Sequence, residues 1–190
     1  YSNLELILVD DCSTDGSLKI AKSYENLDNV TLLQNRKNIG TYQSVNTALH
    51  SARAKEWDYW HFHGSDDISD LTRFKKTLKL FKENPSLIAL KCTCIKTEFG
   101  TNEFILDPKT GQIQIATTEG IAIYDRRIQE HLGYYDNTRF SGDTDMWWRL
   151  EAFCSIHKPE WELGESKEIL YLNFDQVNGG NITKKYDWHT

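Results

Sequence analysis

The stretch ILVDDCSTDG, from Ile7 to Gly16, decides the fold, because an apolar run ends there in two adjacent carboxylates and a polar turn. The pattern predicts a buried strand with Asp10 and Asp11 at its carboxyl end. Ligands bind outside the carboxyl ends of the strands in an open parallel sheet, so this pair is a candidate site. A second apolar run, Trp57 to Phe62, is followed closely by Gly64-Ser65-Asp66-Asp67. Two strands that each lead to an Asp pair suggest one shared acidic site.

Helix capping is the alternative interpretation of each Asp pair, since Asp is a common residue at the start of a helix. Capping needs one acceptor at each helix start, whereas adjacent carboxylates repel each other unless a cation or a hydrogen-bond donor offsets them. Hard oxygen ligands of this kind suit Mg²⁺ or Mn²⁺, and the usual partner of these ions is a phosphate. We therefore expect a divalent cation and a phosphorylated ligand at the acidic site.

Composition restricts the class of protein. The 190 residues are 39% apolar, which fits one soluble domain, and the formal net charge of -6 argues against nucleic acid or an anionic membrane as the main partner. No apolar run approaches the ~20 residues of a membrane span. The four cysteines lack C-x-x-C spacing and are expected to be free thiols. These features favour the cytoplasm, or its membrane face through parts outside this chain.

Strand and helix patterns alternate over the first half, which predicts βαβ units and a parallel sheet. The expected strands span residues 4–9, 30–34 and 57–62, and the expected helices span 17–24, 42–54 and 71–84. The second half is expected to hold strands at 87–95 and 120–124, helices at 126–132 and 143–153, and a hairpin within 97–118 that turns at 107–111.

Five segments, in this order, carry a resemblance to a known family: VDDCSTDGS, the loop Asn38-x-Gly40 with Ser44-x-Asn46-x-Ala48-Leu49, GSDD, EGIAIYDRRIQEHLGYYD, and GDTDMWWRL. Over residues 4–183 the chain resembles a family 2 glycosyltransferase domain. The resemblance implies a GT-A, Rossmann-like α/β fold with a mostly parallel central sheet, flanking helices and a small antiparallel hairpin region. Residues 1–190 then form one domain, with a nucleotide-sugar half at 1–95 and an acceptor half at 96–190.

The resemblance also implies an activity, namely inverting transfer of a sugar from a UDP-linked nucleotide donor, with Mn²⁺ or Mg²⁺ present. Asp10 and Asp11 match the acidic pair in which a carboxylate accepts the N3–H of a pyrimidine base, and Asp11 is preferred. Asn38, Gly40 and Asn46 match the loop beside the donor, where glycine lets the backbone approach and a helix N-terminus points toward phosphate. An ordinary helix start is the alternative for this loop.

The GSDD segment matches the region that binds the metal, the ribose and the diphosphate of the donor. Asp66 is predicted to contact both donor and metal, and Asp67 the metal. Gly64 stands where the commonest form of the motif has Asp. His61 and His63 alternate on one predicted strand, and local packing is preferred to metal binding for them.

Asp143 matches the general base that takes the proton from the acceptor hydroxyl, and helix capping is the alternative or additional role. Gly142 replaces the usual Glu before it. Trp147, Trp148 and Tyr135 are predicted to form an acceptor platform, because flat rings suit the C–H faces of sugars, although a core position is the stronger alternative for each Trp.

Further departures from the family pattern keep a second function open. Val45 replaces a frequent Arg, no His occurs near residues 175–178, and the family's first strand would precede Tyr1, leaving the strand at 4–9 without that neighbour. We therefore expect missing upstream residues or weak donor binding by the fragment. A nucleotide-sugar or glycan-binding module without turnover is the main alternative, and a nucleotidyltransferase is a weaker third. The acceptor, whether glycan, lipid or protein, is not assigned.

Overall fold

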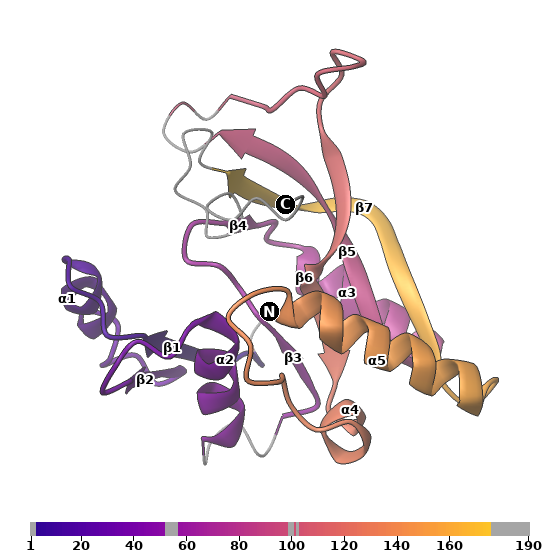
Figure 1. The fold of residues 1–190 in the computed structure, drawn as a ribbon, viewed down its shortest axis with the longest axis horizontal. Helices are drawn as coiled ribbons and strands as arrows, with labels where there is room; N and C mark the ends of the chain where they lie inside the picture. The colour runs from indigo at the N-terminus through magenta and orange to yellow at the C-terminus, as the bar shows by residue number, and fades with distance from the viewer. Residues whose placement is uncertain (1–2, 52–56, 99–100, 102, 176–190) are drawn as a thin grey trace.

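The computed structural model describes residues 3–51, 57–98, 101 and 103–175. The strands within these residues are β1 (Leu6–Asp10), β2 (Val30–Gln34), β3 (Tyr59–His61), β4 (Ile68–Ser69), β5 (Leu87–Glu98), β6 (Ile115–Asp125) and β7 (Glu162–Asp175). The helices are α1 (Ser17–Lys22), α2 (Thr41–His50), α3 (Arg73–Glu83), α4 (Arg127–His131) and α5 (Gly142–His157). Figure 1 shows their arrangement.

The described strands form two sheets. β1 and β2 pair in parallel from Leu6 opposite Val30 to Asp10 opposite Gln34, and α1 and α2 pack against β1. The second sheet has the order β3-β6-β5-β7-β4, in which β5 and β7 are parallel and the other three pairs are antiparallel. The α/β class is confirmed, but the pairing differs from the mostly parallel sheet expected, because β6 returns directly beside β5 and β7 enters from a distant part of the chain.

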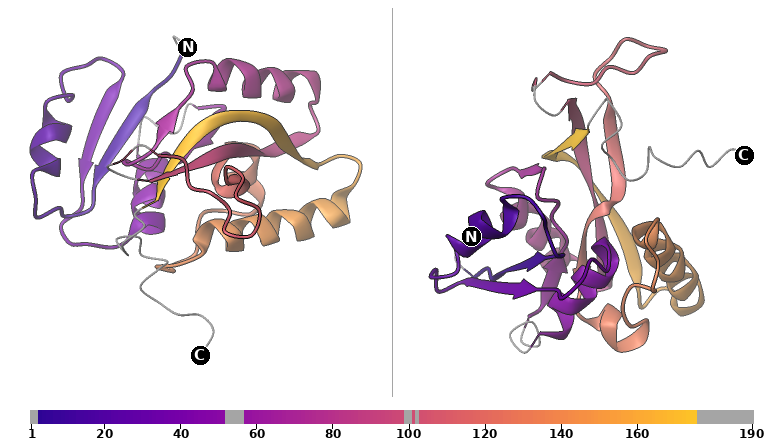
Figure 2. Two further views of the ribbon diagram at one scale, coloured as in Figure 1. Left: turned by 90° about the horizontal axis from the view of Figure 1, so that it is seen from above. Right: turned by 60° about the vertical axis from the view of Figure 1, so that its left-hand side comes forward.

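The sheet divides the core into two layers, because successive side chains of a strand point to opposite faces. In β6, Ala122 and Tyr124 face the layer that α2 and α5 cover, whereas Ile121 and Ile123 face the layer that α3 covers. In β5 a register shift between Leu87 and Ala89 interrupts the alternation, so Ile88 lies in the first layer and Leu90 in the second. Figure 2 shows α3 and α5 on opposite sides of the sheet. The helix α5 contributes Met146, Trp147, Leu150 and Cys154, all buried.

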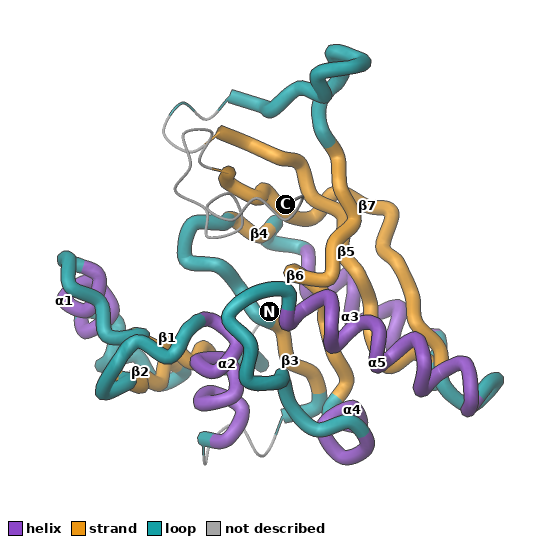
Figure 3. The backbone as a smooth tube through the Cα atoms, in the orientation of Figure 1, coloured by secondary structure: helices purple, strands orange, loops and turns teal. Residues whose placement is uncertain are grey.

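An antiparallel arm extends β5 and β6 beyond the helices, as Figures 2 and 3 show. Beyond β5 the chain turns back, so that Phe104 bridges to Thr97, and a further antiparallel bridge joins Leu106 to Ile113. The Gly111 N–H donates to the carbonyl of Asp107 at 2.8 Å, and Gly111 has a φ of 67°, a conformation that glycine adopts without strain. The expected hairpin within residues 97–118 is therefore confirmed.

Each helix expected from the sequence is present, with ends that shift by a few residues. The expected helix at 42–54 is observed as Thr41–His50, and its last positions fall partly on residues 52–56, outside the described part. Residues 176–178, where the family pattern has a His, also lie outside it. The strand expected at 4–9 does have a neighbour, β2, on one side. The long strand β7 was not predicted.

The described part of the chain contains no helix with both the length and the apolarity needed to cross a bilayer.

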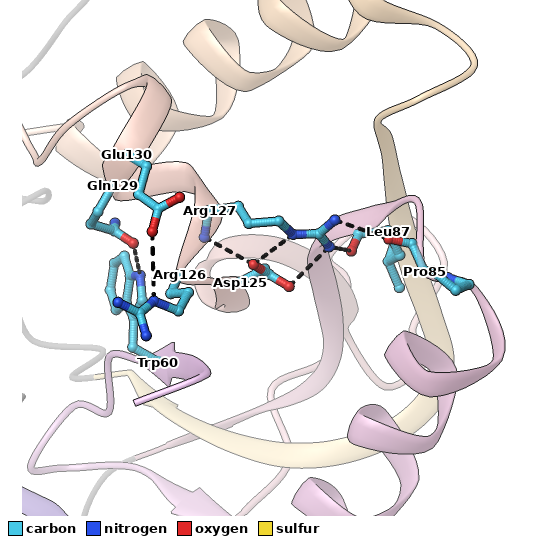
Figure 4. A network of polar contacts seen from close by, with 8 residues as sticks. All are labelled: Trp60, Pro85, Leu87, Asp125, Arg126, Arg127, Gln129 and Glu130. Atoms are coloured by element: carbon cyan, nitrogen blue, oxygen red, sulfur yellow. Dashed lines mark hydrogen bonds and ion pairs between the residues drawn. The ribbon is translucent and has the colours of Figure 1, made fainter. Parts of the chain in front are cut away.

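A polar network joins the end of β6 to the start of β5 (Figure 4). The guanidinium of Arg127 makes two hydrogen bonds of 2.9 Å to the carboxylate of Asp125. It also donates to the carbonyls of Pro85 and Leu87, both at 3.1 Å. The Asp125 side chain is only 10% exposed, so this bidentate pair compensates a carboxylate that is largely removed from water.

Replacing Arg127 with Ala should lower the free energy of unfolding by about 2–3 kcal/mol, because the buried Asp125 carboxylate loses its cation and two carbonyls lose a donor. Urea denaturation measures the change. Arg126→Ala is the matched control, since Arg126 and Glu130 form an exposed pair at 3.8 Å and its loss should cost no more than about 0.5 kcal/mol. Equal effects of the two substitutions would contradict the structural role of the network.

Candidate active site

Asp11 lies directly after β1 and is held by the loop that leads into α2. Its Oδ1 accepts hydrogen bonds from the Ile39 N–H and the Asn35 side-chain amide, both at 2.9 Å. Its Oδ2 accepts from the Gly40 N–H at 2.8 Å. Gly40 has a φ of 87°, which brings its N–H toward the carboxylate before the helix begins. Asp11 thereby connects the end of β1 to the first turn of α2.

Two opposing effects act on the pKa of Asp11. Partial burial acts to raise this pKa, but the donors of Ile39, Asn35 and Gly40 together outweigh it and hold the pKa below its usual range. The positive end of α2 therefore already faces a carboxylate of the protein itself. A carboxylate has about four acceptor positions, so these hydrogen bonds leave little capacity for a base. The predicted contact with a pyrimidine N3–H stays a prediction.

The other predicted nucleotide residues divide into surface and core positions. Asn38 is exposed beside Asp11 and donates to its main-chain carbonyl at 3.2 Å. Asp10 is buried. Asn46 is also buried, and its side-chain amide bonds both the carbonyl and the N–H of Tyr135, at 2.8 and 3.1 Å. In this structure the Asn46 side chain connects α2 to the loop before α5, and its predicted nucleotide-binding role stays a prediction.

Asp67, in the loop between β3 and β4, is held by β7. Its Oδ1 accepts from the Asn173 amide and the Phe174 N–H, both at 2.9 Å, and its Oδ2 accepts from the Tyr171 hydroxyl at 2.8 Å. The pKa of Tyr171 is raised, first by burial and then by the negative charge of Asp67, so the phenol remains a donor. Sequence reasoning missed Tyr171 and Asn173, and the alternating apolar residues of ILYLNF were their only signal.

Gly64 allows the carboxylates of Asp66 and Asp67 to approach each other. A Cβ at position 64 would lie 2.8 Å from Asp66 Oδ1 and 2.8 Å from Asp67 Oδ2. A side chain at this position would displace both groups, which explains why glycine replaces the expected Asp here. Because Mg²⁺ and Mn²⁺ sites often use one or two carboxylates together with phosphate oxygens, this pair fits such an ion. Among the described residues, there is no group of three or more His, Cys, Asp or Glu side chains that could hold a metal ion.

A fully buried arginine, Arg73, contacts residues on both sides of the loop that contains Asp66 and Asp67. It donates to His61 Nε2 at 3.0 Å and to the carbonyl of Ile121, and its guanidinium lies 4.6 Å from the centre of the Tyr171 ring. The pKa of His61 lies well below its usual range, because of burial first and then the positive charge of Arg73. His61 is therefore neutral and accepts from Arg73. This agrees with the packing role expected for the histidine.

Asp143 lies in the first turn of α5 and is half-buried. Its Oδ1 accepts a hydrogen bond from the Tyr42 hydroxyl at 2.7 Å. Its Oδ2 lies 3.1 Å from the position that a Cβ of Gly120 would occupy, so glycine on β6 leaves room beside this oxygen. Tyr42 was not singled out by the sequence, because nothing in the pattern of α2 relates it to a residue 101 positions away.

The predicted acceptor platform is mostly in the core. Tyr135 and Trp147 are 6% and 4% exposed, and both belong to the cluster under α5. Their burial favours the core position over contact with a sugar, and the acceptor role of these two rings stays a prediction. Trp148 is 66% exposed and remains a candidate. Adjacent residues on a helix point about 100° apart, which separates the two tryptophans.

Contacts through β6 connect the acidic groups. Gly120 lies beside Asp143, while the next two residues, Ile121 and Ala122, offer their carbonyls to Arg73 and to His61, the last at 3.3 Å. The rings of His61 and His63 are in contact, with centres 5.7 Å apart, and His63 immediately precedes the loop that contains Asp66 and Asp67. Asp11 is connected to Asp143 through the first turn of α2.

Comparison with known sequences supports one family. The family model described as Glycosyl transferase family 2 matches residues 1–149. The putative glycosyltransferase EpsE of Bacillus subtilis (strain 168) is 38% identical over 86 residues, which cover 44% of this chain and 30% of that protein. The chain therefore spans less than half the length of this relative.

Comparison with solved structures supports the fold. The chain is similar to S. aureus TarS 1-349 in complex with UDP-GlcNAc, with a TM-score of 0.64 and 20% identity over 90% of this chain and 50% of that one. It is also similar to the mannosyltransferase PcManGT from Pyrobaculum calidifontis in complex with GDP-Man and Mn²⁺, with a TM-score of 0.61 and 14% identity over 90% of this chain and 47% of that one. At this identity the similarity shows the GT-A fold alone.

Asp11→Asn should lower the free energy of unfolding by about 1–2 kcal/mol at pH 7, because an amide cannot satisfy all the donors that now face the carboxylate. The pKa of Asp11 is lowered by folding, so its stabilising contribution is complete above the unfolded value near about pH 4 and is lost as pH falls below it. Denaturation at pH 7 and pH 3 measures both proteins. An equal difference at the two pH values would contradict the ionic character of this contact.

Proposed function

Because the chain belongs to glycosyl transferase family 2, we propose that it transfers a sugar from a nucleotide donor to an acceptor hydroxyl, with inversion at the anomeric carbon. The observation that carries this proposal is the carboxylate of Asp143, which Tyr42 holds beside Gly120 of β6, together with the paired carboxylates of Asp66 and Asp67 above Gly64. A direct displacement requires a base beside the attacking hydroxyl and a group that binds the leaving diphosphate on the opposite side of the sugar.

UDP is the nucleotide that we propose for the donor. The support is that TarS, which shares this fold, was crystallised with UDP-GlcNAc. The base would lie at the edge formed by the end of β1 and the exposed Asn38, near Asp11. The exposed side-chain amide of Asn38 is a polar group at this edge that a base can contact.

We propose that Mn²⁺ or Mg²⁺ binds with the donor at Asp66 and Asp67. The support is the convergence of the two carboxylates above Gly64 and the Mn²⁺ present in the PcManGT complex, which has the same fold. An ion at this position would neutralise charge that develops on the leaving diphosphate. The residues of this chain hold the carboxylates in place for it, because Tyr171, Asn173 and the Phe174 N–H fix Asp67.

We propose Asp143 as the general base. It is half-buried, one of its oxygens is held by Tyr42, and Gly120 leaves space beside the other. A carboxylate in this arrangement can accept the proton of an acceptor hydroxyl that approaches within about 3 Å, a contribution of about 10²- to 10⁴-fold. Trp148, exposed on the same helix, is the candidate that its exposure favours for contact with the acceptor.

A binding module without turnover is the second candidate. Two features favour it: Gly64 in place of the usual Asp, and the many hydrogen bonds that Asp11 and Asp67 already accept. Each leaves fewer carboxylate oxygens free to bind a nucleotide sugar or its metal ion. Titration calorimetry with UDP and Mn²⁺, followed by a donor-hydrolysis assay, distinguishes the two candidates. Binding without any release of UDP from UDP-sugars would favour the module.

Asp143→Asn should reduce sugar transfer at least about a hundredfold while the affinity for UDP changes less than about twofold, because the amide keeps the shape but cannot take a proton. Steady-state kinetics and calorimetry measure the two quantities. A parallel loss of rate and UDP affinity would argue against the role of base.

Mn²⁺ is expected to increase the affinity for UDP. Asp66→Asn should reduce this increase by at least about tenfold, since a neutral amide is a poor ligand for a hard cation. Calorimetry with and without Mn²⁺ measures the gain. Asp58→Asn is the control, because Asp58 is exposed before β3 and outside the acidic loop. If both variants keep the full gain, Asp66 is not a metal ligand.

A further inference from the structure

The ring of Tyr42 occupies the space that a side chain at position 142 would need. A Cβ on Gly142 would lie 2.7 Å from both Cγ and Cδ2 of the Tyr42 ring. Contacts below 3.0 Å of this kind require a shift, and here the obstacle is a rigid ring and not a flexible chain end. The family pattern has Glu at this position, so the Tyr42 ring and a Glu side chain exclude each other in this geometry.

Tyr42 is fixed from three directions. It lies in the first turn of α2, two residues after Gly40, whose N–H binds Asp11 at 2.8 Å. Its ring packs against the ring of Tyr135, with centres 5.2 Å apart, at the edge of the core. Its hydroxyl donates to Asp143 Oδ1 at 2.7 Å. A hydroxyl held in this way can fix the orientation of the carboxylate that it contacts.

The phenol of Tyr42 remains protonated throughout the neutral range. Burial raises the pKa of Tyr42, and the negative charge of Asp143 raises it further. The hydrogen bond is therefore a phenol donating to a carboxylate throughout the neutral range. Proton transfer from the acceptor would go to the other oxygen, Oδ2, which lies above Gly120.

We propose that Tyr42 is a positioning residue for Asp143, which holds Oδ1 and thereby directs Oδ2 toward the acceptor hydroxyl in place of the Glu that precedes the base in the family pattern. This inference rests on the proposed role of Asp143 as general base. In this proposal, the absence of a side chain at Gly142 and the hydroxyl of Tyr42 serve the same purpose, the orientation of Asp143. Neither the family pattern nor the sequence of α2 indicates this role.

Tyr42→Phe tests the proposal, because it removes the hydroxyl and keeps the ring. The expected result is a loss of roughly ten- to a hundredfold in kcat, with the KM for the donor and the affinity for UDP changed less than about twofold. Tyr134→Phe is the matched control, since it removes a hydroxyl from a ring that packs on His50, at a centre distance of 4.0 Å, away from Asp143. Unchanged kcat in Tyr42→Phe would overturn the proposal.

A double-mutant cycle separates the positioning role from the role of the base. If Tyr42 acts through Asp143, adding Tyr42→Phe to Asp143→Asn should reduce kcat less than about twofold further. Additive losses would overturn the positioning role. Full activity of Asp143→Asn would instead disprove the proposed base, whereas a slow Asp143→Asn with a fully active Tyr42→Phe would disprove only the present inference.

Gly142→Ala provides an independent measurement. Its new Cβ should displace the Tyr42 ring and lower kcat to a similar extent as Tyr42→Phe, although residue 142 supplies no reacting atom. Circular dichroism and urea denaturation verify that the variant is folded. A folded Gly142→Ala with full kcat would show that the close packing of Tyr42 is not needed for orientation of the carboxylate.

Discussion

The first turn of α2 is held between two carboxylates, and the geometry of the candidate active site depends on this arrangement. Asp11 binds the N–H groups of Ile39 and Gly40 at the start of the turn, and Tyr42 donates to Asp143 from within it. The small parallel sheet and the start of α5 are therefore connected through a few charge-assisted hydrogen bonds, which are stronger than neutral ones. A shift of this turn would move Asp11, beside the proposed nucleotide edge, and Asp143, the proposed base, together.

The strand β7 controls the other side of the site. It pairs in parallel with β5 and brings Tyr171, Asn173 and the Phe174 N–H to the carboxylate of Asp67. Arg73, fully buried, lies against the Tyr171 ring. A buried cation is costly without compensation, and the aromatic face, the neutral His61 and the Ile121 carbonyl supply it. The loop that contains Asp66 and Asp67 therefore lies next to a buried polar cluster whose positive charge is Arg73.

Local patterns in the sequence predicted most elements, because each depends on neighbours close in the chain. The apolar run of β1, the spacing of Met146 and Leu150 in α5, and the hairpin around Gly111 are examples. The pairing of β7 with β5 could not be predicted in this way, since register shifts interrupt it and its partners are far apart in sequence. The direction of β6 followed from its hairpin with β5, which an expectation of parallel strands did not weigh.

The sequence by itself determined which acidic residues end up at strand and helix ends, and through them the family to which the chain belongs. Only the tertiary structure decided which of these groups remain available to a ligand. Three residues that match the expected pattern are buried in the core between α2 and α5, namely Asn46, Tyr135 and Trp147. Availability depends on contacts between residues as distant as Tyr42 and Asp143, and such contacts leave no local periodicity in a single sequence.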